Sequence, residues 1–186
     1  MTQTSTETRK TQITLRQMIA VALCACVLAV ISQISIPMPT GVPLTLQTFA
    51  VALIGCVLGV KSGMLAIVVY LLIGAVGVPV FSGFGAGFHK LVGATGGFLF
   101  GFIPMAALCA LGQRKGIIGK IIWGALGLTI CHVLGVTQFS LVSGNGFIAA
   151  FAMVSAPYLI KDILSVALAY LVSRPILNRL PESFTE

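Results

Sequence analysis

Long apolar stretches, separated by short polar or glycine- and proline-rich breaks, occupy most of the chain. About 20 apolar residues are enough for one helix to span the hydrocarbon core of a bilayer, and most of the stretches approach this length. Their pattern predicts an all-α integral membrane protein with six transmembrane helices. The predicted helices lie at about 15–34, 46–60, 63–79, 93–111, 118–139 and 147–173.

The breaks between these helices carry residues that helices disfavour. Three prolines within 37–43 cannot continue a helix, because proline lacks a backbone N–H and clashes with the preceding turn. We therefore expect an ordered loop with some extended character over 35–45. Gly59–Gly63 separates the second and third helices, a glycine-rich loop runs over 82–90, and 140–146 forms a polar gap.

Polar ends flank the apolar region. Residues 1–13, rich in Thr and Gln, predict a mobile cytoplasmic tail, and 176–186 predict a second cytoplasmic tail. Residues 14–175 remain as one membrane domain. A basic start followed by an apolar stretch also describes a secretory signal peptide. A first transmembrane helix is the favoured interpretation, because the stretch is long and further spans follow it.

Composition excludes several classes of protein. Of the 186 residues, 58% are hydrophobic and only 8% are charged, whereas soluble domains carry about a quarter charged residues. So few charges cannot cover a soluble surface, which excludes a soluble enzyme, a nucleic-acid-binding module and a disordered protein. The net charge is +7, but the bases are scattered without a basic stripe, so we expect no nucleic-acid partner.

The basic residues predict the orientation in the membrane, since cytoplasmic loops collect Lys and Arg. With the N-terminus inside, nine of the eleven bases fall on the cytoplasmic side, and both termini are cytoplasmic. We expect a multi-pass protein of a prokaryotic-type cell membrane, in contact with its lipids. Lys90 and Lys161 break the rule, which marks them as candidates for function.

Asp162 is the only carboxylate between residues 8 and 181. A carboxylate at the centre of a membrane costs roughly 2.5–3.5 kcal/mol, so it must face a cavity or a partner. An ion pair with Lys161 is the simplest alternative, but neighbouring residues on a helix point about 100° apart. The small and polar face through Ser165 and Ser173 favours an inward-facing Asp162 that does not pair with Lys161.

Two uncharged loops carry further candidates. Thr45 and Gln47 share one face if the backbone is extended, although Gln47 equally fits a plain helix-start residue. The 82–90 loop combines small residues with Phe84, Phe88 and Lys90, and its glycines allow the backbone to approach a ligand closely.

The sequence shows no catalytic or metal-binding pattern. His89 and His132 have no carboxylate nearby in the sequence, so a packing role is favoured for both, and the five cysteines lie in apolar runs without metal-ligand spacing. We expect no enzyme activity and no cofactor. An ion-coupled secondary transporter remains an alternative, although no inverted repeat is visible.

Three blocks of the sequence resemble the BioY family, the biotin-specific substrate-binding (S) components of energy-coupling-factor (ECF) vitamin importers. The blocks are Ile34–Ala50, Tyr70–Phe81 and Leu91–Phe102, and the resemblance covers about 15–175. Two family patterns are altered: Gly-Pro-Thr-Gly-Gly-Tyr reads Gly-Ala-Thr-Gly-Gly-Phe at 93–98, and Pro-Val-Pro reads Gly-Val-Pro at 41–43.

The resemblance implies an ECF S-component fold and a function. Such a protein captures biotin with high affinity from the outside and delivers it across the membrane as part of an ATP-driven importer. Another small vitamin is the alternative ligand. The implied partners are a transmembrane T component and two ATPase subunits, and a homo-oligomer stays open.

The resemblance also implies a docking surface for the T component. Family members use small residues four apart on the first helix, where backbones can approach closely. In this chain the pair is either Ala22 with Cys26 or Ala25 with Ala29.

Biotin chemistry assigns roles to the candidate residues. Its ureido ring offers two N–H donors, which suit the Asp162 carboxylate assisted by Thr45 or Gln47. Its carboxylate needs a cation or backbone N–H groups, so we assign it to Lys90 and the glycine loop at Gly85, with Lys161 second. Its thiophane ring needs apolar walls. Tyr70, Phe84 and Phe88 are the predicted walls.

Overall fold

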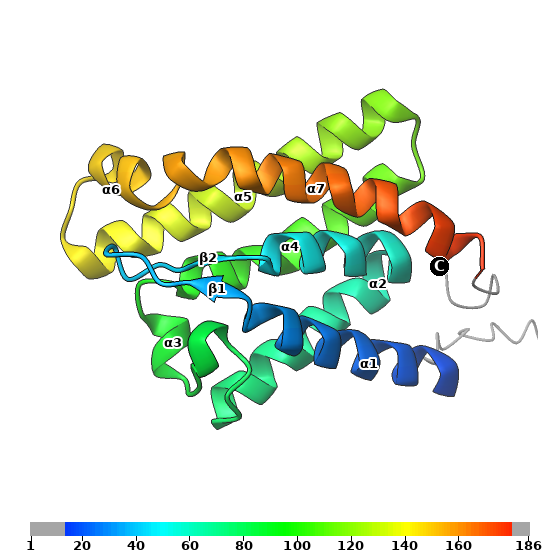
Figure 1. The fold of residues 1–186 in the computed structure, drawn as a ribbon, viewed down its shortest axis with the longest axis horizontal. Helices are drawn as coiled ribbons and strands as arrows, with labels where there is room; N and C mark the ends of the chain where they lie inside the picture. Colours follow the sequence, from blue (N-terminus) through cyan, green and yellow to red (C-terminus); the bar gives the residue numbers. More distant parts are fainter. Residues whose placement is uncertain (1–13, 180–186) are drawn as a thin grey trace, which may run out of the picture.

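The computed structural model describes residues 14–179, and helices form most of this part of the chain (Figure 1). Five of them, α1, α2, α4, α5 and α7, are long and apolar enough to cross a membrane. The all-helical prediction is confirmed, whereas the count of six spans stays a prediction. The helices are α1 (Leu15–Ser32), α2 (Gln47–Val76), α3 (His89–Val92), α4 (Gly96–Gln113), α5 (Ile117–Ser143), α6 (Phe147–Val154) and α7 (Ala156–Leu177).

Two segments outside the helices contribute to the site. An antiparallel hairpin, β1 (Ser35–Ile36) and β2 (Leu44–Thr45), follows α1 and confirms the extended character expected for the proline-rich loop. A single 3₁₀ turn, η1 (Ser82–Phe84), lies between α2 and α3.

The two predicted tails differ in what the structure says about them. The predicted N-terminal tail, 1–13, lies outside the described residues. The described chain begins at Thr14, whose side chain accepts a hydrogen bond from the Gln17 backbone N–H in a capping box at the start of α1. At the other end α7 continues to Leu177, two residues beyond the predicted end of the membrane domain at 175. Residues 180–186 are not described.

The helix α2 is divided by a sharp break at Gly59, as the sequence predicts for Gly59–Gly63. Gly59 has φ 80° and ψ −175°, a backbone conformation that only glycine adopts readily. The chain reverses there, so the two parts of α2 form a V (Figure 1). Gly63 returns so close to Gly55 that a Cβ on Gly63 would lie 3.1 Å from the Gly55 Cα atom.

The last apolar stretch is not one helix, which corrects the prediction for 147–173. It is divided at Ser155 into α6 and α7, and Ser155 has φ −124° and ψ −56°. Pro157 lies in the first turn of α7, where a backbone N–H has no partner within the helix, so its absence does not weaken α7. The same proline cannot extend α6, because it lacks the N–H that a helix interior needs. The break aims Ser155 at α5, which matters for the site below.

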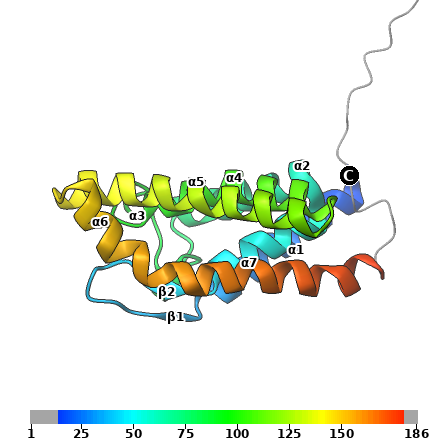
Figure 2. The same ribbon diagram turned by 90° about the horizontal axis from the view of Figure 1, so that it is seen from above.

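Small residues bring α4 close to α5. A Cβ on Gly97 would lie 2.2 Å from the Leu134 carbonyl oxygen, and one on Gly101 would lie 2.7 Å from the Cys131 Cα atom. These two glycines lie four residues apart on α4, and without side chains they let the two backbones come into direct contact. Viewed from above, α4 and α5 lie in one layer, whereas α7 and the β-hairpin lie in the other (Figure 2).

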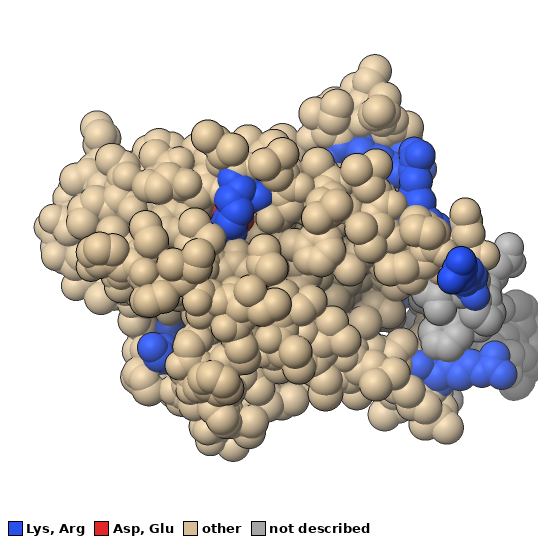
Figure 3. All heavy atoms as spheres, in the orientation of Figure 1, with Lys and Arg blue, Asp and Glu red and all other residues tan. Residues whose placement is uncertain are grey.

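The basic residues gather at one end of the molecule. The start of α1, the break in α2, the α4–α5 connection and the end of α7 all lie at this end (Figure 1). On the face shown in Figure 3, most Lys and Arg side chains cluster over these segments, and two smaller basic patches lie away from them. Such clustering is typical of a cytoplasmic end, and the orientation itself stays a prediction.

Candidate substrate-binding site

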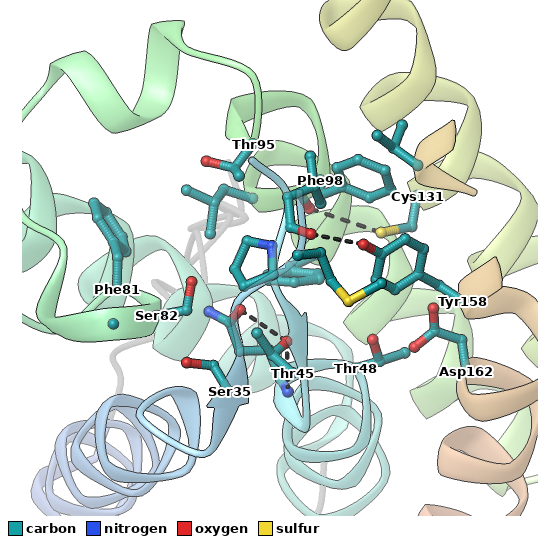
Figure 4. Close-up of a pocket in the computed structure, with 18 of the residues that line it drawn as sticks. Ser35, Thr45, Thr48, Phe81, Ser82, Thr95, Phe98, Cys131, Tyr158 and Asp162 are labelled. Atoms are coloured by element: carbon teal, nitrogen blue, oxygen red, sulfur yellow. Dashed lines mark hydrogen bonds between the residues drawn. The ribbon is translucent and has the colours of Figure 1, made fainter. Parts of the chain in front are cut away.

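A cavity of about 540 Å³ opens between the β-hairpin, the start of α2, and helices α4, α5 and α7. Its size is in the range that holds small organic ligands. Segments far apart in the sequence meet here, and Figure 4 shows their side chains pointing into a common space. The polar and charged residues on its wall include Gln33, Ser35, Thr45, Gln47, Thr48, Ser82, Lys90, Thr95, His132, Tyr158, Lys161 and Asp162.

Asp162 lies on the cavity wall with 5% of its surface exposed, so the prediction of an inward-facing carboxylate is confirmed. The prediction that it avoids Lys161 is wrong, because Lys161 Nζ lies 2.5 Å from Asp162 Oδ1. Neighbouring Cβ atoms on a helix do diverge, but the long lysine side chain bends back across this angle. Lys161 Nζ also donates a hydrogen bond to the Thr45 carbonyl oxygen at 2.7 Å, which links α7 to the β-hairpin.

The Asp162 carboxylate keeps free capacity to accept hydrogen bonds. Its Oδ1 atom is buried and, among the described residues, has no hydrogen-bond donor in good geometry despite the close Lys161 ammonium. An ionised carboxylate can accept about four hydrogen bonds. Thr48 points toward the same group from α2 (Figure 4). An N–H donor of a ligand in the cavity would therefore find an acceptor already held in place.

His132 of α5 is a site residue to which the sequence assigned only a packing role. Its Nε2 lies 3.2 Å from Asp162 Oδ2, and its Nδ1 lies 2.8 Å from the Ser155 hydroxyl. An ionised carboxylate only accepts hydrogen bonds, so Nε2 carries the hydrogen in this contact. Phe98 packs edge-on against the ring, with centroids 5.8 Å apart. These contacts hold the carboxylate in one orientation.

Thr45 and Gln47 come together, as predicted from their spacing. The Thr45 hydroxyl donates to Gln47 Oε1 at 3.1 Å, and the Gln47 side-chain amide donates to the Tyr70 hydroxyl at 2.9 Å. The Tyr70 hydroxyl in turn donates to the Val80 carbonyl oxygen at 3.1 Å. Gln47 is also the first residue of α2, so both interpretations of this residue hold.

The predicted apolar walls are replaced by others. Tyr70 is fully buried behind Gln47 and does not line the cavity, and Phe84 and Phe88, which are 73% and 65% exposed, do not line it either. Phe84 ends the 3₁₀ turn with φ 56°, and its backbone N–H donates to the Gln33 side chain, which directs its ring outward. The apolar walls include Phe98, Leu99, Phe102 and Leu128.

Lys90 lines the cavity from α3, whereas Gly85 lies beside it without lining the cavity itself. A Cβ on Gly85 would lie 3.0 Å from the Lys90 Cε atom, so the glycine leaves room for the lysine side chain. Lys90 and Lys161 contribute two positive charges to the wall, and Asp162 contributes one negative charge. Two lysines and one carboxylate leave the lining residues with a net positive charge, which favours an anionic ligand.

A loop closes one side of the cavity. The Tyr158 hydroxyl of α7 donates to the Val42 carbonyl oxygen at 2.6 Å. The Val42 side chain is buried in a small apolar cluster with Val136, Phe139 and Val154. The segment between β1 and β2 is thus tied to the far helices by one hydrogen bond and one apolar contact, and neither was predicted from sequence.

Comparison with known proteins identifies relatives along nearly the whole chain. The model of the BioY family matches residues 3–182. A probable biotin transporter BioY of Pyrococcus horikoshii is 36% identical over 153 residues, which are 82% of this chain and 91% of that protein. A biotin transporter BioY of Thermotoga maritima is also 36% identical, over 86% of this chain and 94% of that protein.

A solved structure shares the fold. The crystal structure of the S-component for biotin from an ECF-type ABC transporter matches with a TM-score of 0.82, over 92% of this chain and 96% of that chain. The sequence identity is only 18%. This similarity therefore concerns the arrangement of the helices, which is that of an ECF S component.

Proposed function

Because this chain belongs to the BioY family, we propose that it captures biotin from outside the cell and delivers it inward as the S component of an ATP-driven ECF importer. The family is one of transporters, not enzymes, and several apolar helices make the chain a multi-pass membrane protein. The observation that carries the proposal is the cavity, which holds a buried carboxylate with free acceptor capacity and a net positive charge among its lining residues.

The adjacent charges of Asp162 and Lys161 match the ureido ring of biotin. The ring presents N–H donors next to a carbonyl acceptor. Asp162 Oδ1 accepts from an N–H, and the Lys161 ammonium, 2.5 Å from that oxygen, donates to the ring carbonyl. Both charged groups are already fixed by His132 and by the Thr45 carbonyl oxygen, so little side-chain entropy is lost on binding.

This arrangement leaves Lys90 for the biotin carboxylate. Lys90 is the other cation on the cavity wall, and we assign Lys161 to the ureido ring rather than to the carboxylate. Thr45 and Gln47 satisfy each other and Tyr70. We therefore assign them to holding the cavity wall in shape, with ligand contact as a secondary role.

For the partner complex, we propose that α1 docks on the T component through Ala22 and Cys26. These two residues are exposed on α1, whereas Ala25 is 3% exposed in the core and Ala29 packs against it. Ala22→Trp with Cys26→Trp should abolish co-purification with the T component and the two ATPase subunits while leaving biotin binding unchanged. Val27→Trp is the control, because Val27 is exposed but lies about 100° around the helix from Cys26, and this variant should retain the complex.

A proton-coupled carrier is the second candidate function, favoured by the buried His132–Asp162 contact, because such pairs can relay protons in membranes. Proteoliposomes that contain this chain alone should not accumulate biotin after a pH step. Accumulation against a gradient would favour the carrier over the ECF importer.

The first experiment is isothermal titration calorimetry of the detergent-purified chain with biotin, after a denatured sample has been searched for co-purified vitamin. We expect nanomolar binding or released biotin. A folded, empty protein that binds no biotin would contradict the proposal and favour another small vitamin.

A further inference from the structure

A second large cavity among the described residues is an apolar groove of about 500 Å³ between α5 and α7. Its walls come only from these two helices, and aliphatic side chains dominate them. Small residues at Gly124, Ala125 and Ala167 leave the space open. Several groove-lining side chains, such as those of Ile121 and Ile163, are exposed, so the groove faces the surroundings of the helices.

One wall of the groove is a fixed tyrosine ring. The Tyr170 hydroxyl donates to the Cys109 carbonyl oxygen of α4 at 3.2 Å, and a Cβ on Gly112 would collide with this hydroxyl at 2.3 Å. The ring is thus anchored to α4 while its face borders the groove. Lys120 Nζ lies 5.6 Å from the ring centroid, within the range of a cation–π contact.

Two cations line one end of this groove. Lys120 comes from the first turns of α5 and Arg174 from the last turn of α7. The ion pairs among residues 14–179 both involve Asp162, so neither cation has a carboxylate partner in the described chain. Both helix ends belong to the basic end of the molecule (Figures 1 and 3). An apolar groove that ends in two cations has the charge pattern of an anionic amphiphile.

We propose that this groove binds one anionic glycerophospholipid, with its phosphate between Lys120 and Arg174 and an acyl chain along the apolar walls. A guanidinium can bind phosphate through two parallel hydrogen bonds. Anionic lipids are enriched in the cytoplasmic leaflet, and basic pockets between membrane helices on that side bind their headgroups. The proposal does not depend on biotin binding. The groove is distinct from the 540 Å³ cavity that we assign to biotin, called the vitamin cavity below, and the two share only Leu128.

Native mass spectrometry of the delipidated full chain tests the proposal. Dioleoyl-phosphatidylglycerol and dioleoyl-phosphatidylcholine are titrated separately, since they share acyl chains and differ in headgroup charge. We expect the wild type to prefer phosphatidylglycerol. Lys120→Gln with Arg174→Gln should weaken phosphatidylglycerol binding by about 25-fold, or about fivefold for each cation, and should abolish the preference.

A matched control removes the same charge elsewhere. Arg114→Gln with Lys115→Gln also lowers the net charge by two, and these exposed residues lie in the α4–α5 connection outside the groove. This variant should keep the lipid preference. Ala167→Trp should weaken the binding of both lipids, because the indole ring fills the groove while both cations remain. Arg174→Gln alone keeps the test measurable if the double variant does not fold.

Four outcomes would overturn the proposal. The first is equal binding of the two lipids by the wild type, and the second is an unchanged preference in the Lys120/Arg174 variant. The third is an equal loss of phosphatidylglycerol binding in both double variants, which would indicate that the lipid responds to the net charge of the protein and not to a specific site. The fourth is displacement of phosphatidylglycerol by inorganic phosphate at matched concentration, which would indicate a site for free anions.

Discussion

The two cavities that α5 and α7 both help to line are similar in size and opposite in chemistry. The vitamin cavity measures about 540 Å³ and the groove about 500 Å³, and Leu128 lies on the wall of both. The first contains Asp162, held by His132 and Lys161. The second contains cations without an acid among the described residues. Volume therefore says little about the ligand, whereas the placement of one buried carboxylate separates a site for N–H donors from a site for anions.

The difference also explains why each cavity lies where it does. Asp162 can remain charged because α5, α7 and the β-hairpin all supply polar groups around it, and a buried charge without such partners is very costly. Lys120 and Arg174 lie near helix ends, where long basic side chains can reach the membrane surface. The polar cavity is therefore built from several segments that stabilise its charge, whereas the apolar groove is built from two helices alone.

The largest expected effect comes from removing the charge that separates the two cavities. Asp162→Asn should weaken biotin binding by about 100-fold, because a charge-assisted hydrogen bond is lost and Lys161 is left without its counter-charge. Calorimetry measures the loss, and the phosphatidylglycerol preference of the same variant should not change. Wild-type biotin affinity in Asp162→Asn would show that the ureido assignment is wrong.

Lys90 should show a smaller effect of a different kind. Lys90→Gln should weaken biotin binding by about tenfold, because an ionic contact to the carboxylate is lost. The variant should bind biotin and its methyl ester equally well. Lys61→Gln is the matched control, because it removes one exposed positive charge next to the Gly59 break, outside the cavity. If Lys90→Gln still prefers biotin over the ester, the carboxylate is bound elsewhere, with Lys161 as the next candidate.

The fold could be predicted where hydropathy and backbone chemistry agree. The Gly59 break was visible because glycines and a lysine interrupt an apolar stretch. The Ser155 break was not, because the residues around it are apolar and a proline in the first turn of a helix is compatible with a continuous apolar pattern. Local signals locate a break only when the composition changes with it.

The site could be predicted from sequence where a single residue is unusual for a membrane-spanning helix without reference to any other residue. Asp162 was found because a single carboxylate in a long apolar region needs a partner. His132 was missed because its role depends on α5 and α7 meeting across 30 residues of sequence. Phe84 and Phe88 were assigned to the wall from loop composition, which carries no information on the direction of a side chain.

The closing loop should contribute less than either charge. Tyr158→Phe removes the hydrogen bond to the Val42 carbonyl oxygen, worth about 1 kcal/mol, so biotin should dissociate about fivefold faster with little change in its association rate. Stopped-flow displacement of a fluorescent biotin measures both rates. Lipid binding in the groove should not respond. An unchanged dissociation rate would mean that the Val42 side chain alone holds the loop closed.

The smallest effect should come from the residue that the two cavities share. Leu128→Ala removes an apolar contact from each wall. If each ligand loses burial equivalent to one methylene, worth about 0.8 kcal/mol, biotin and phosphatidylglycerol should each bind about fourfold more weakly. Calorimetry and native mass spectrometry measure the two constants in the same preparation. Leu99→Ala is the control, because Leu99 lines only the vitamin cavity and should affect biotin alone. If Leu128→Ala weakens one ligand but not the other, the unaffected ligand does not contact the wall between α5 and α7, and its placement in that cavity must be revised.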